Sequence, residues 1–536
     1  MSHIPKEVNE AIDALKSRKF FSAFPEFHKA YPEEWMKDGE VAFNTSLGNY
    51  FKEIEFGKNV TWIGEEVSPI TLKPLGIKYP AAPVEDLVKQ AEEVKSEWKG
   101  SSINQRVEIL WDALNGMKRR FFEIAHATTH TTGQSFMMAF QASGPHAADR
   151  ALEAIALGFE ELTRITSEVE WEKPMGKTSI KLKKQFKPIP KGVGLIIGCS
   201  TFPVWNSLPG IFANLICGNP VIVKPHSLAI LPLAIALCEL QKSLKKAGFS
   251  VNIVQIAVDT QSNPITKQLA EHPLIKLIDY TGNTTFGNYL EGLKGKTVFT
   301  EKSAINPVII DSSENLEESL QNLTFSMLLY SGQMCTAPQN IYISEKGVKT
   351  PERTVSYPEV VKLLNTQLSA LLNHPKIGAG TMANIQNQKT VSILKSLAPI
   401  KAAENGVGRT LNPTLVEITG DNKLVNEEVF GPFFKLVKTR GIDHSLSLAK
   451  ENAQQHGAIT CLAFCAEQKL KDKILNEMES VFTPVSFNLK GNFWVNQHAA
   501  FSDFHVTGGN ASGNASFTNP NFINQRFVWL GHREME

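Results

Sequence analysis

Cysteine is scarce in this chain. The 536 residues include 6 cysteines, which are scattered along the chain and form no Cys-x-x-Cys pair. Disulfide-stapled folds need a denser set of cysteines in a shorter chain, and structural zinc sites usually bring their ligands in such pairs. We therefore expect free thiols in a reducing compartment and no bound metal.

An excess of charge of either sign is also lacking. Lys and Arg number 55 and Asp and Glu 54, so the formal net charge is +1. Proteins that hold a nucleic-acid backbone or an anionic membrane surface usually carry a clear positive excess. Nucleic acids and membranes are therefore not expected as partners.

Uninterrupted apolar segments are missing too. The segment 1–21 mixes charges of both signs and contains no uncharged core of signal-peptide length. The uncharged stretch 192–223 is long enough to cross a bilayer, but three prolines and several glycines interrupt it. These features predict a cytoplasmic protein in which this stretch forms a buried strand, loop, helix and strand.

What the chain does contain is alternation of strand and helix patterns. An extension, residues 1–75, is rich in phenylalanine and shows one helical pattern near its start, and the charged segment 165–190 has the features of an exposed hairpin. From residue 192 onward, apolar strands alternate with helical segments in two blocks, which predicts parallel sheets covered by helices. Helices are expected at about 84–98, 105–130, 205–216, 229–247, 264–271, 284–293, 315–330, 357–372 and 382–397.

Polar residues follow three of the predicted strands, and ligands of open parallel sheets bind beyond such strand ends. Lys224 begins the sequence KPHS, Thr281 begins TGNTTFG, and Glu301 follows TVFT. Backbone N–H groups at the helix start after TGN suit a phosphate, and a carboxylate beside an apolar strand suits a general base. Each segment taken alone is more often a plain turn or a solvated charge.

Cys335 differs from the other cysteines in its surroundings. It lies in the polar segment YSGQMCTAPQN after an apolar helix, whereas Cys217, Cys238, Cys461 and Cys465 fall inside apolar patterns and are expected in the core. We expect Cys335 at a junction between a loop and a helix, where peptide dipoles stabilise a thiolate. It is therefore a candidate nucleophile.

A set of motifs, taken together, resembles the aldehyde dehydrogenase superfamily in order and spacing. Lys224-Pro225 and the loop 281–287 come first, Glu301 lies 34 residues before Cys335, and the string EEVFGP follows at 427–432. The resemblance covers about residue 80 to the end. Segments such as FFSAFPE, THTTGQSFMMAFQ and SGQMCTAPQN resemble the PaaN branch, the phenylacetic-acid-degradation aldehyde dehydrogenases, and that likeness includes the N-terminal extension.

The resemblance implies a reaction mechanism and the residues that carry it. Cys335 would attack an aldehyde to form a thiohemiacetal, which passes a hydride to NAD or NADP and leaves a thioester, and Glu301 would activate the water that releases the acid. Family members stabilise the oxyanion with an Asn before Phe-Pro, whereas this chain has Thr201 there, which we expect to donate instead. Asn206 is expected to be a helix-start residue.

The resemblance also implies cofactor contacts. The residues concerned are Lys224 and Ser227 at the adenine ribose, Gly282, Asn283 and Gly287 at the pyrophosphate, and Glu428 and Phe430 at the nicotinamide ribose and ring. Ser227 stands where the family often has an acid, so a group that repels a 2′-phosphate is missing and NADP is expected beside NAD. The segment 301–304 reads Glu-Lys-Ser-Ala and lacks the glycines that follow the base in the family, so release to coenzyme A instead of water stays open.

We therefore predict an α/β fold of the aldehyde dehydrogenase type, with a Rossmann-like NAD(P)-binding domain, an α/β catalytic domain and a β-hairpin oligomerisation arm. The resemblance implies a homodimer or homotetramer acting on an aldehyde of aromatic-acid catabolism, free or linked to coenzyme A. A cofactor-free Cys thioesterase and an inactive scaffold stay open as alternatives. The expected divisions are the extension 1–75, the NAD(P)-binding domain 76–300 interrupted by the arm 165–190, the catalytic domain 301–505 and a C-terminal arm 506–536.

Overall fold

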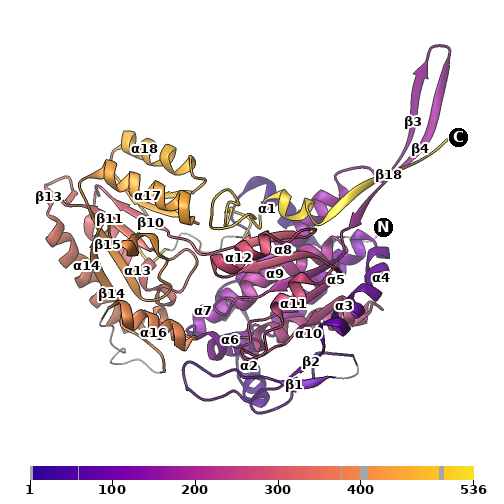
Figure 1. The fold of residues 1–536 in the computed structure, drawn as a ribbon, viewed down its shortest axis with the longest axis horizontal. Helices are drawn as coiled ribbons and strands as arrows, with labels where there is room; N and C mark the ends of the chain where they lie inside the picture. The colour runs from indigo at the N-terminus through magenta and orange to yellow at the C-terminus, as the bar shows by residue number, and fades with distance from the viewer. Residues whose placement is uncertain (1–3, 58–59, 376, 399–407, 494–499, 536) are drawn as a thin grey trace.

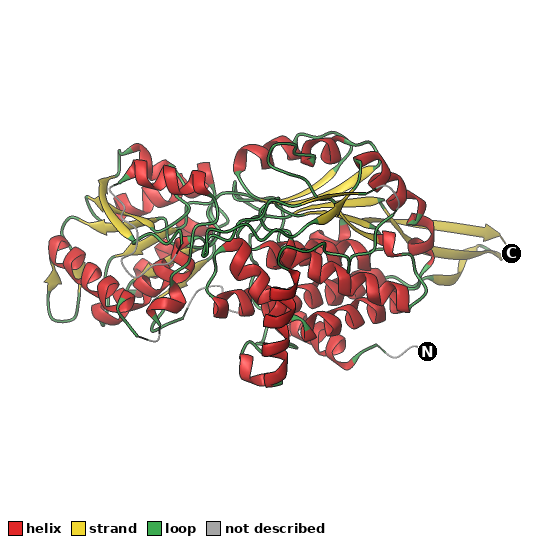
Figure 2. Cartoon of the chain, turned by 90° about the horizontal axis from the view of Figure 1, so that it is seen from below, coloured by secondary structure: helices red, strands yellow, loops and turns green. Residues whose placement is uncertain are grey.

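The computed structural model describes residues 4–57, 60–375, 377–398, 408–493 and 500–535. Within these ranges the chain forms two α/β lobes and a long arm of strands that projects from one of them (Figure 1). Loops of both lobes meet where the lobes adjoin (Figure 2). The candidate site residues lie on these loops and at the strand ends beside them.

The first lobe is built on a parallel sheet of five strands in the order β7-β6-β5-β8-β9. The strands are β5 (Val193–Ile197), β6 (Val221–Lys224), β7 (Val254–Ile256), β8 (Ile275–Thr281) and β9 (Thr297–Glu301). The helices between them are α9 (Pro203–Ile216), α10 (Leu231–Lys246), α11 (Thr266–Glu271) and α12 (Thr284–Glu291). The predicted alternation is confirmed, because central strands that are covered on both faces read as continuous apolar runs.

The strand order reverses beside β5. The chain runs outward from β5 through β6 to β7 and then crosses to β8 and β9 on the other side. Loops that leave the carboxyl ends of such strands in opposite directions open a crevice in which ligands bind. Lys224, Thr281 and Glu301 end β6, β8 and β9 at this edge.

The uncharged stretch 192–223 contains β5, α9 and the first part of β6, as predicted. Its strands are paired inside the five-stranded sheet. None of the helices in the described ranges is long and apolar enough to span a membrane.

The second lobe contains a parallel sheet of six strands in the order β14-β15-β11-β10-β16-β17. The strands are β10 (Pro307–Ile310), β11 (Asn340–Ser344), β14 (Thr414–Thr419), β15 (Phe433–Thr439), β16 (Cys461–Phe464) and β17 (Val485–Phe487). The helices are α13 (Leu316–Leu328), α14 (Tyr357–Leu372), α15 (Gly378–Thr381), α16 (Gln388–Leu397), α17 (Ile442–His456) and α18 (Gln468–Glu479). The expected core cysteines Cys217, Cys238, Cys461 and Cys465 are all buried.

The N-terminal extension holds a helix that the sequence did not predict, α2 (Glu33–Ser46). Its buried residues are Gly39 and Phe43, which is too few for an apolar period. A Cβ on Gly39 would lie 2.6 Å from the Cβ of Phe122, so this helix packs closely on its neighbour. Tertiary packing, not the local pattern, explains this element.

The helical layer of the first lobe is more segmented than predicted. The expected helix 105–130 is interrupted at Arg120, and Gly133 ends its second half in a left-handed conformation with φ 88°. The helices of this layer and the extension are α1 (Lys6–Ser17), α3 (Val84–Glu93), α4 (Lys95–Gly100), α5 (Ile103–Arg119), α6 (Phe121–Thr132), α7 (Phe136–Gln141) and α8 (Ala147–Thr163).

The projecting arm is an antiparallel sheet in the order β18-β4-β3. The predicted hairpin is confirmed as β3 (Glu168–Met175) and β4 (Thr178–Pro190), and the C-terminal strand β18 (Phe527–Met535) pairs with it. Beside β18, Arg526 forms a buried two-pronged ion pair with Asp279 of β8, at 2.6 and 2.8 Å, which ties the C-terminal segment to the first lobe. Other short elements include β1 (Thr61–Ile63), β2 (Tyr79–Ala81), β12 (Val348–Lys349), β13 (Thr354–Val355) and α19 (Pro520–Asn524).

Candidate active site

Cys335 lies in the turn between α13 and β11. The three consecutive residues 330–332 before it have φ angles of 54°, 52° and 67°, so all are left-handed. Such a run is unfavourable for side chains other than glycine and persists only where the surroundings hold it. At Gly332 the space is also restricted, since a Cβ there would lie 2.5 Å from the carbonyl oxygen of Gly431. The position of Cys335 is therefore fixed by contacts with the rest of the second lobe.

Glu301 is the last residue of β9 and is buried. Its two carboxylate oxygens have different partners: Nδ2 of Asn206 donates to Oε2 at 3.0 Å, and Nε2 of His505 lies 3.3 Å from Oε1. The carboxylate is thus held from both sides.

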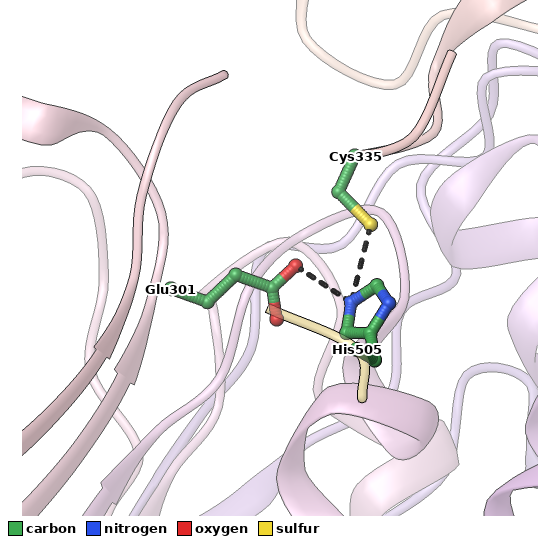
Figure 3. A group of neighbouring side chains, drawn as sticks. All are labelled: Glu301, Cys335 and His505. Atoms are coloured by element: carbon green, nitrogen blue, oxygen red, sulfur yellow. Dashed lines mark hydrogen bonds and ion pairs between the residues drawn. The ribbon is translucent and has the colours of Figure 1, made fainter. Parts of the chain in front are cut away.

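His505 joins the two predicted catalytic residues (Figure 3). Its Nε2 lies 3.7 Å from Sγ of Cys335 as well as 3.3 Å from Glu301. The imidazole is buried, with Trp205 against it edge-on at a centroid distance of 4.9 Å. The sequence did not predict His505, because it occurs in a loop without a helical or strand period, and tertiary folding brings it to residues 170 and 204 positions away.

The electrostatic surroundings of Cys335 oppose a free thiolate. Burial raises the pKa of the thiol well above its usual value, and the carboxylate of Glu301 raises it further, followed by Cys199 and Glu428. The turn leads into β11, so the expected loop–helix junction is wrong and no helix dipole assists the thiolate there. Deprotonation of Cys335 therefore needs a neighbouring group that stabilises the thiolate or takes its proton.

Cys335 lies between two pockets. The polar pocket, of about 270 Å³, is lined by Cys199, Ser200, Thr201, Phe202, Asn206, Thr281, Gly282, Asn283, Glu301, Lys302, Ser303, Gln333, Cys335, Ile385, Gln386, Asn387, Thr390, Glu428 and Phe430. The apolar pocket, of about 140 Å³, is lined by Met138, Gln141, Ala142, His146, Phe202, Trp205, Asn206, Phe325, Leu329, Met334, Cys335, Thr336 and His505. Phe202, Asn206 and Cys335 line both, whereas Glu301 lines the first and His505 the second.

Most of the residues singled out from the sequence come together in the polar pocket. They are Cys335, Glu301, Thr201, Gly282, Asn283, Glu428 and Phe430. The other three, Gly287, Lys224 and Ser227, are not part of its lining. Gly287 lies further along α12, where a Cβ would meet the side chain of Lys302 at 2.6 Å.

The model of the aldehyde dehydrogenase family matches residues 65–526, which include both lobes and both pockets. The chain belongs to the aldehyde dehydrogenase family.

Solved structures of other proteins have a similar fold. An NAD-dependent aldehyde dehydrogenase from Burkholderia multivorans is 36% identical, with a TM-score of 0.94 over 99% of this chain and 97% of that chain. A 1-pyrroline-5-carboxylate dehydrogenase from Thermus with bound NAD is 18% identical, with a TM-score of 0.76 over 96% and 99%. The glyceraldehyde-3-phosphate dehydrogenase GapN from Methanocaldococcus jannaschii, complexed with NADP, is 16% identical, with a TM-score of 0.71 over 89% and 100%. The last two show the α/β fold alone.

Within this aldehyde dehydrogenase fold, Asn206 has a different place from the one expected. It lies inside α9, whose N-cap is Phe202, and its side-chain amide donates to Glu301 instead of capping the helix. Thr201 lines the polar pocket, where its hydroxyl lies 4.0 Å from Sγ of Cys199. The side-chain amide near Glu301 thus comes from Asn206, five residues after Thr201, which occupies the position of the family's Asn.

Lys224 and His226 have surroundings that the family motif did not reveal. Nζ of Lys224 pairs with Asp259 at 2.7 Å and donates to the carbonyl of Pro225 at 2.7 Å. Burial, followed by the charge of Lys224, lowers the pKa of His226 to about 4, so this imidazole is neutral at neutral pH. The two groups therefore contribute less positive charge to the strand end than their residue types indicate.

Glu428 is anchored to the segment after Glu301, because the backbone N–H of Ala304 donates to its Oε1 at 3.1 Å. Burial raises the pKa of this carboxyl. Behind it, Nζ of Lys435 in β15 donates to the carbonyls of Leu424 and Glu427, at 2.9 and 2.5 Å, and holds the chain on both sides of the turn. Burial lowers the pKa of Lys435 to about 7.

The start of α12 has the properties of a phosphate site. The helix follows β8 at the carboxyl edge of the sheet, its N-cap is Asn283, and that side chain accepts from the backbone N–H of Phe286 at 2.9 Å. Gly282 and Asn283 line the polar pocket. A helix N-terminus at the edge of a pocket suits the pyrophosphate of a dinucleotide.

Glu301, Cys335 and His505 also lie close enough for their O, S and N atoms to be within 4.8 Å of one another, a spacing that a metal ion can bridge. The contacts among them are explained by direct hydrogen bonds. The expectation that the chain binds no metal stays a prediction.

Proposed function

We propose that the protein oxidises an aldehyde to a carboxylic acid with NAD or NADP, through a thioester on Cys335. The observation that carries this proposal is the position of the thiol between two pockets of different character. An aldehyde carbonyl that enters from the apolar pocket and a nicotinamide held in the polar pocket would meet at the sulfur. Family membership supports the reaction type.

The first half of the proposed reaction forms the thioester. The Cys335 thiolate attacks the carbonyl carbon, and Thr201 with the backbone N–H of Cys335 is proposed to stabilise the oxyanion. When bound, NAD or NADP accepts the hydride that leaves the thiohemiacetal carbon. Cys335 keeps the acyl group as a thioester.

The second half releases the acid. Glu301 is proposed to take a proton from the attacking water, as a general base. Its carboxylate is held by Asn206 and His505, and Nζ of the next residue, Lys302, forms an ion pair with Glu291 at 3.0 Å and donates to Asn288 at 2.8 Å. These contacts favour a base that acts from a fixed place, which compensates for the missing glycines. Release to coenzyme A is the alternative that acyl-CoA formation would reveal.

Cofactor placement follows from the polar pocket. Gly282 and Asn283 are proposed to meet the pyrophosphate, with Gly287 supporting the loop, and Glu428 with Phe430 the nicotinamide ribose and ring. Lys224 and Ser227 are proposed at the adenine ribose, outside this pocket. Asp259 beside Lys224 supplies a negative charge there, and the Burkholderia relative is NAD-dependent, so NAD is favoured over NADP.

An aldehyde with an apolar, especially aromatic, body is the proposed substrate. Aromatic and thioether side chains such as Trp205, Phe325 and Met334 line the pocket on the side of Cys335 away from the cofactor. The resemblance of the chain to the PaaN branch agrees with an aldehyde of phenylacetate or related aromatic catabolism, free or linked to coenzyme A. The apolar lining provides dispersion and stacking contacts for such a group.

A panel of aromatic and aliphatic aldehydes, tested with NAD and NADP, decides the proposal. Formation of NADH or NADPH together with the carboxylic acid supports it, and acyl-CoA formed in the presence of coenzyme A assigns the acylating alternative. Thioester hydrolysis without nucleotide would identify a cofactor-free thioesterase instead. The absence of both reactions across the panel indicates a scaffold.

We also propose that the arm assembles the protein as a homodimer or homotetramer. Each outer strand of the arm, β3 and β18, has one edge that pairs with β4 and a second edge outside this sheet. Apolar side chains such as Val528 and Leu530 are exposed there. Light scattering of the full chain and of a variant shortened before β18 tests this, since the shortened chain should lose assembly.

A further inference from the structure

The Cys335 thiol has to lose its proton before it attacks a carbonyl. Burial and the carboxylates of Glu301 and Glu428 oppose this step by raising the thiol pKa, and the backbone after Cys335 continues into a strand instead of a helix. A thiol in such surroundings needs a neighbouring base that becomes a cation when it takes the proton. A carboxylate that takes the proton becomes neutral and leaves the thiolate without a cation beside it.

His505 meets this requirement, because its imidazole lies beside the thiol and becomes a cation when it takes a proton. We propose that His505 is the base that takes the proton of the Cys335 thiol through Nε2 and holds it beside Glu301. This inference rests on the proposed function for the use of the thiolate, but not for its formation. Nε2 is the atom that lies 3.7 Å from Sγ and 3.3 Å from Oε1 of Glu301, so a single proton on it faces both partners.

The proposed step moves one proton from sulfur to nitrogen and changes no oxidation state. The S–H bond of Cys335 breaks, an N–H bond forms at Nε2, and a thiolate faces an imidazolium whose positive charge the Glu301 carboxylate stabilises. The thiolate then attacks the aldehyde. When water later cleaves the thioester, its proton goes to Glu301 and from there to solvent, and the departing thiolate returns to the imidazolium.

The two pockets separate the two bases. His505 lines the apolar pocket and not the polar one, while Glu301 lines the polar pocket and not the apolar one. A nucleotide in the polar pocket would therefore cover the side of Glu301 and leave His505 next to the thiol. This arrangement assigns activation of the nucleophile to His505 and activation of water to Glu301.

Packing fixes the imidazole for this role. Trp205 meets the ring at 83° and Phe517 stacks on it at 25°, with centroids 4.9 and 6.0 Å away. The charged and titratable groups that bear on the pair are Glu301, Cys335, Cys199 and Glu428, with Asp503 near His505 and Arg150 over the faces of Trp205 and Phe517. Three of these groups, Glu301, Glu428 and Asp503, are carboxyl groups.

The test is the rate at which neutral iodoacetamide alkylates Cys335, followed by mass spectrometry as a function of pH in the absence of aldehyde and nucleotide. Alkylation reports the thiolate fraction. In the wild type we expect substantial alkylation at neutral pH. In His505→Gln we expect the rate near neutral pH to fall by roughly tenfold or more and its inflection to move up by about one pH unit or more. Cys335→Ala, which lacks this thiol, gives the background of alkylation at other cysteines.

Two variants keep the result interpretable. His505→Phe retains an aromatic ring against Trp205 and Phe517, so it serves if the Gln variant does not fold, and it should give the same slow alkylation. Glu301→Gln separates the two bases. Alkylation that is slow in Glu301→Gln but unchanged in both His505 variants would assign the thiol proton to Glu301 and overturn the proposal.

The outcome is independent of the proposed reaction. If the protein oxidises none of the tested aldehydes, the alkylation profile still shows whether His505 controls the thiol. If aldehydes are oxidised while His505→Gln retains the wild-type profile, the function stands and this inference does not. A readout based on ultraviolet thiolate absorbance, as the difference between wild type and Cys335→Ala, checks the same ion pair without alkylation.

Discussion

The side-chain amide of Asn206 in α9 donates a hydrogen bond of 3.0 Å to the carboxylate of Glu301 at the end of β9. Asn206 also lines both pockets at Cys335. The two residues couple the helix after the first strand of the sheet to the last strand, across the crevice in which ligands of such sheets bind.

Loss of this amide should slow release of the acid. In Asn206→Ala, one oxygen of Glu301 loses its donor, and hydrogen bonds to charged groups contribute about 1.5 to 3 kcal/mol. We expect steady-state turnover to fall roughly tenfold to hundredfold while the first burst of NADH keeps its amplitude. Thr201→Ala is the comparison, because loss of an oxyanion donor should slow the burst itself. The same slowing of the burst in Asn206→Ala would place the amide at the oxyanion instead.

Replacement of the nucleophile should abolish oxidation. Cys335→Ala removes the atom that carries the acyl group, which adds several kcal/mol to the barrier, so turnover should fall below about 1% of wild type. Binding of NAD, measured by fluorescence or calorimetry, should survive. Cys465→Ala, a buried cysteine of the same lobe, is the matched control and should keep its activity. Retained oxidation in Cys335→Ala would exclude the covalent route.

Glu301→Gln should separate hydride transfer from release. The amide keeps the shape of the carboxylate but cannot take a proton from water, so we expect a burst of NADH of up to one equivalent per site and then a stall. Mass spectrometry should find the acyl group on Cys335. A missing burst would place Glu301 at an earlier step.

An element or site residue could be predicted from the sequence only where a pattern of neighbouring residues marks it. The five strands of the first sheet were predictable because each is a short apolar run between turn residues, and Glu301 and Cys335 were found because they end such runs or stand out from them. His505 and Asn206 could not be assigned in this way. Their roles arise from contacts with residues 95 to 204 positions away, which no local period encodes. The helix α2 was missed for the same reason, since its fit depends on Gly39 against Phe122.

Stability should depend on pH through Lys435. Burial lowers its pKa to about 7 from the usual 10.5, so between these values the unfolded chain binds a proton that the folded chain does not. The free energy of unfolding should therefore rise with pH in this window, by at most about 1.4 kcal/mol per pH unit, and this gain is absent below pH 7. Urea titrations at several pH values measure the slope. The difference between wild type and Lys435→Met isolates it, and equal slopes in the two proteins would show that Lys435 is not responsible.

The choice between NAD and NADP should depend on residues in the loops that follow β6 and β7. Position 227 is a serine where the family often has an acid, which would repel a 2′-phosphate. Asp259, which pairs with Lys224 at 2.7 Å, restores a negative charge nearby. Charge-assisted hydrogen bonds to phosphate contribute about 1.5 to 3 kcal/mol each. Ser227→Glu should therefore weaken NADP relative to NAD by roughly tenfold or more, whereas Asp259→Asn, which frees Lys224 for the phosphate, should shift the ratio the other way. Titration of both nucleotides against the three proteins measures these ratios, with Thr260→Asn as the control for a polar change on the same loop. An affinity ratio that stays constant across Ser227→Glu and Asp259→Asn would mean that the adenine ribose lies elsewhere.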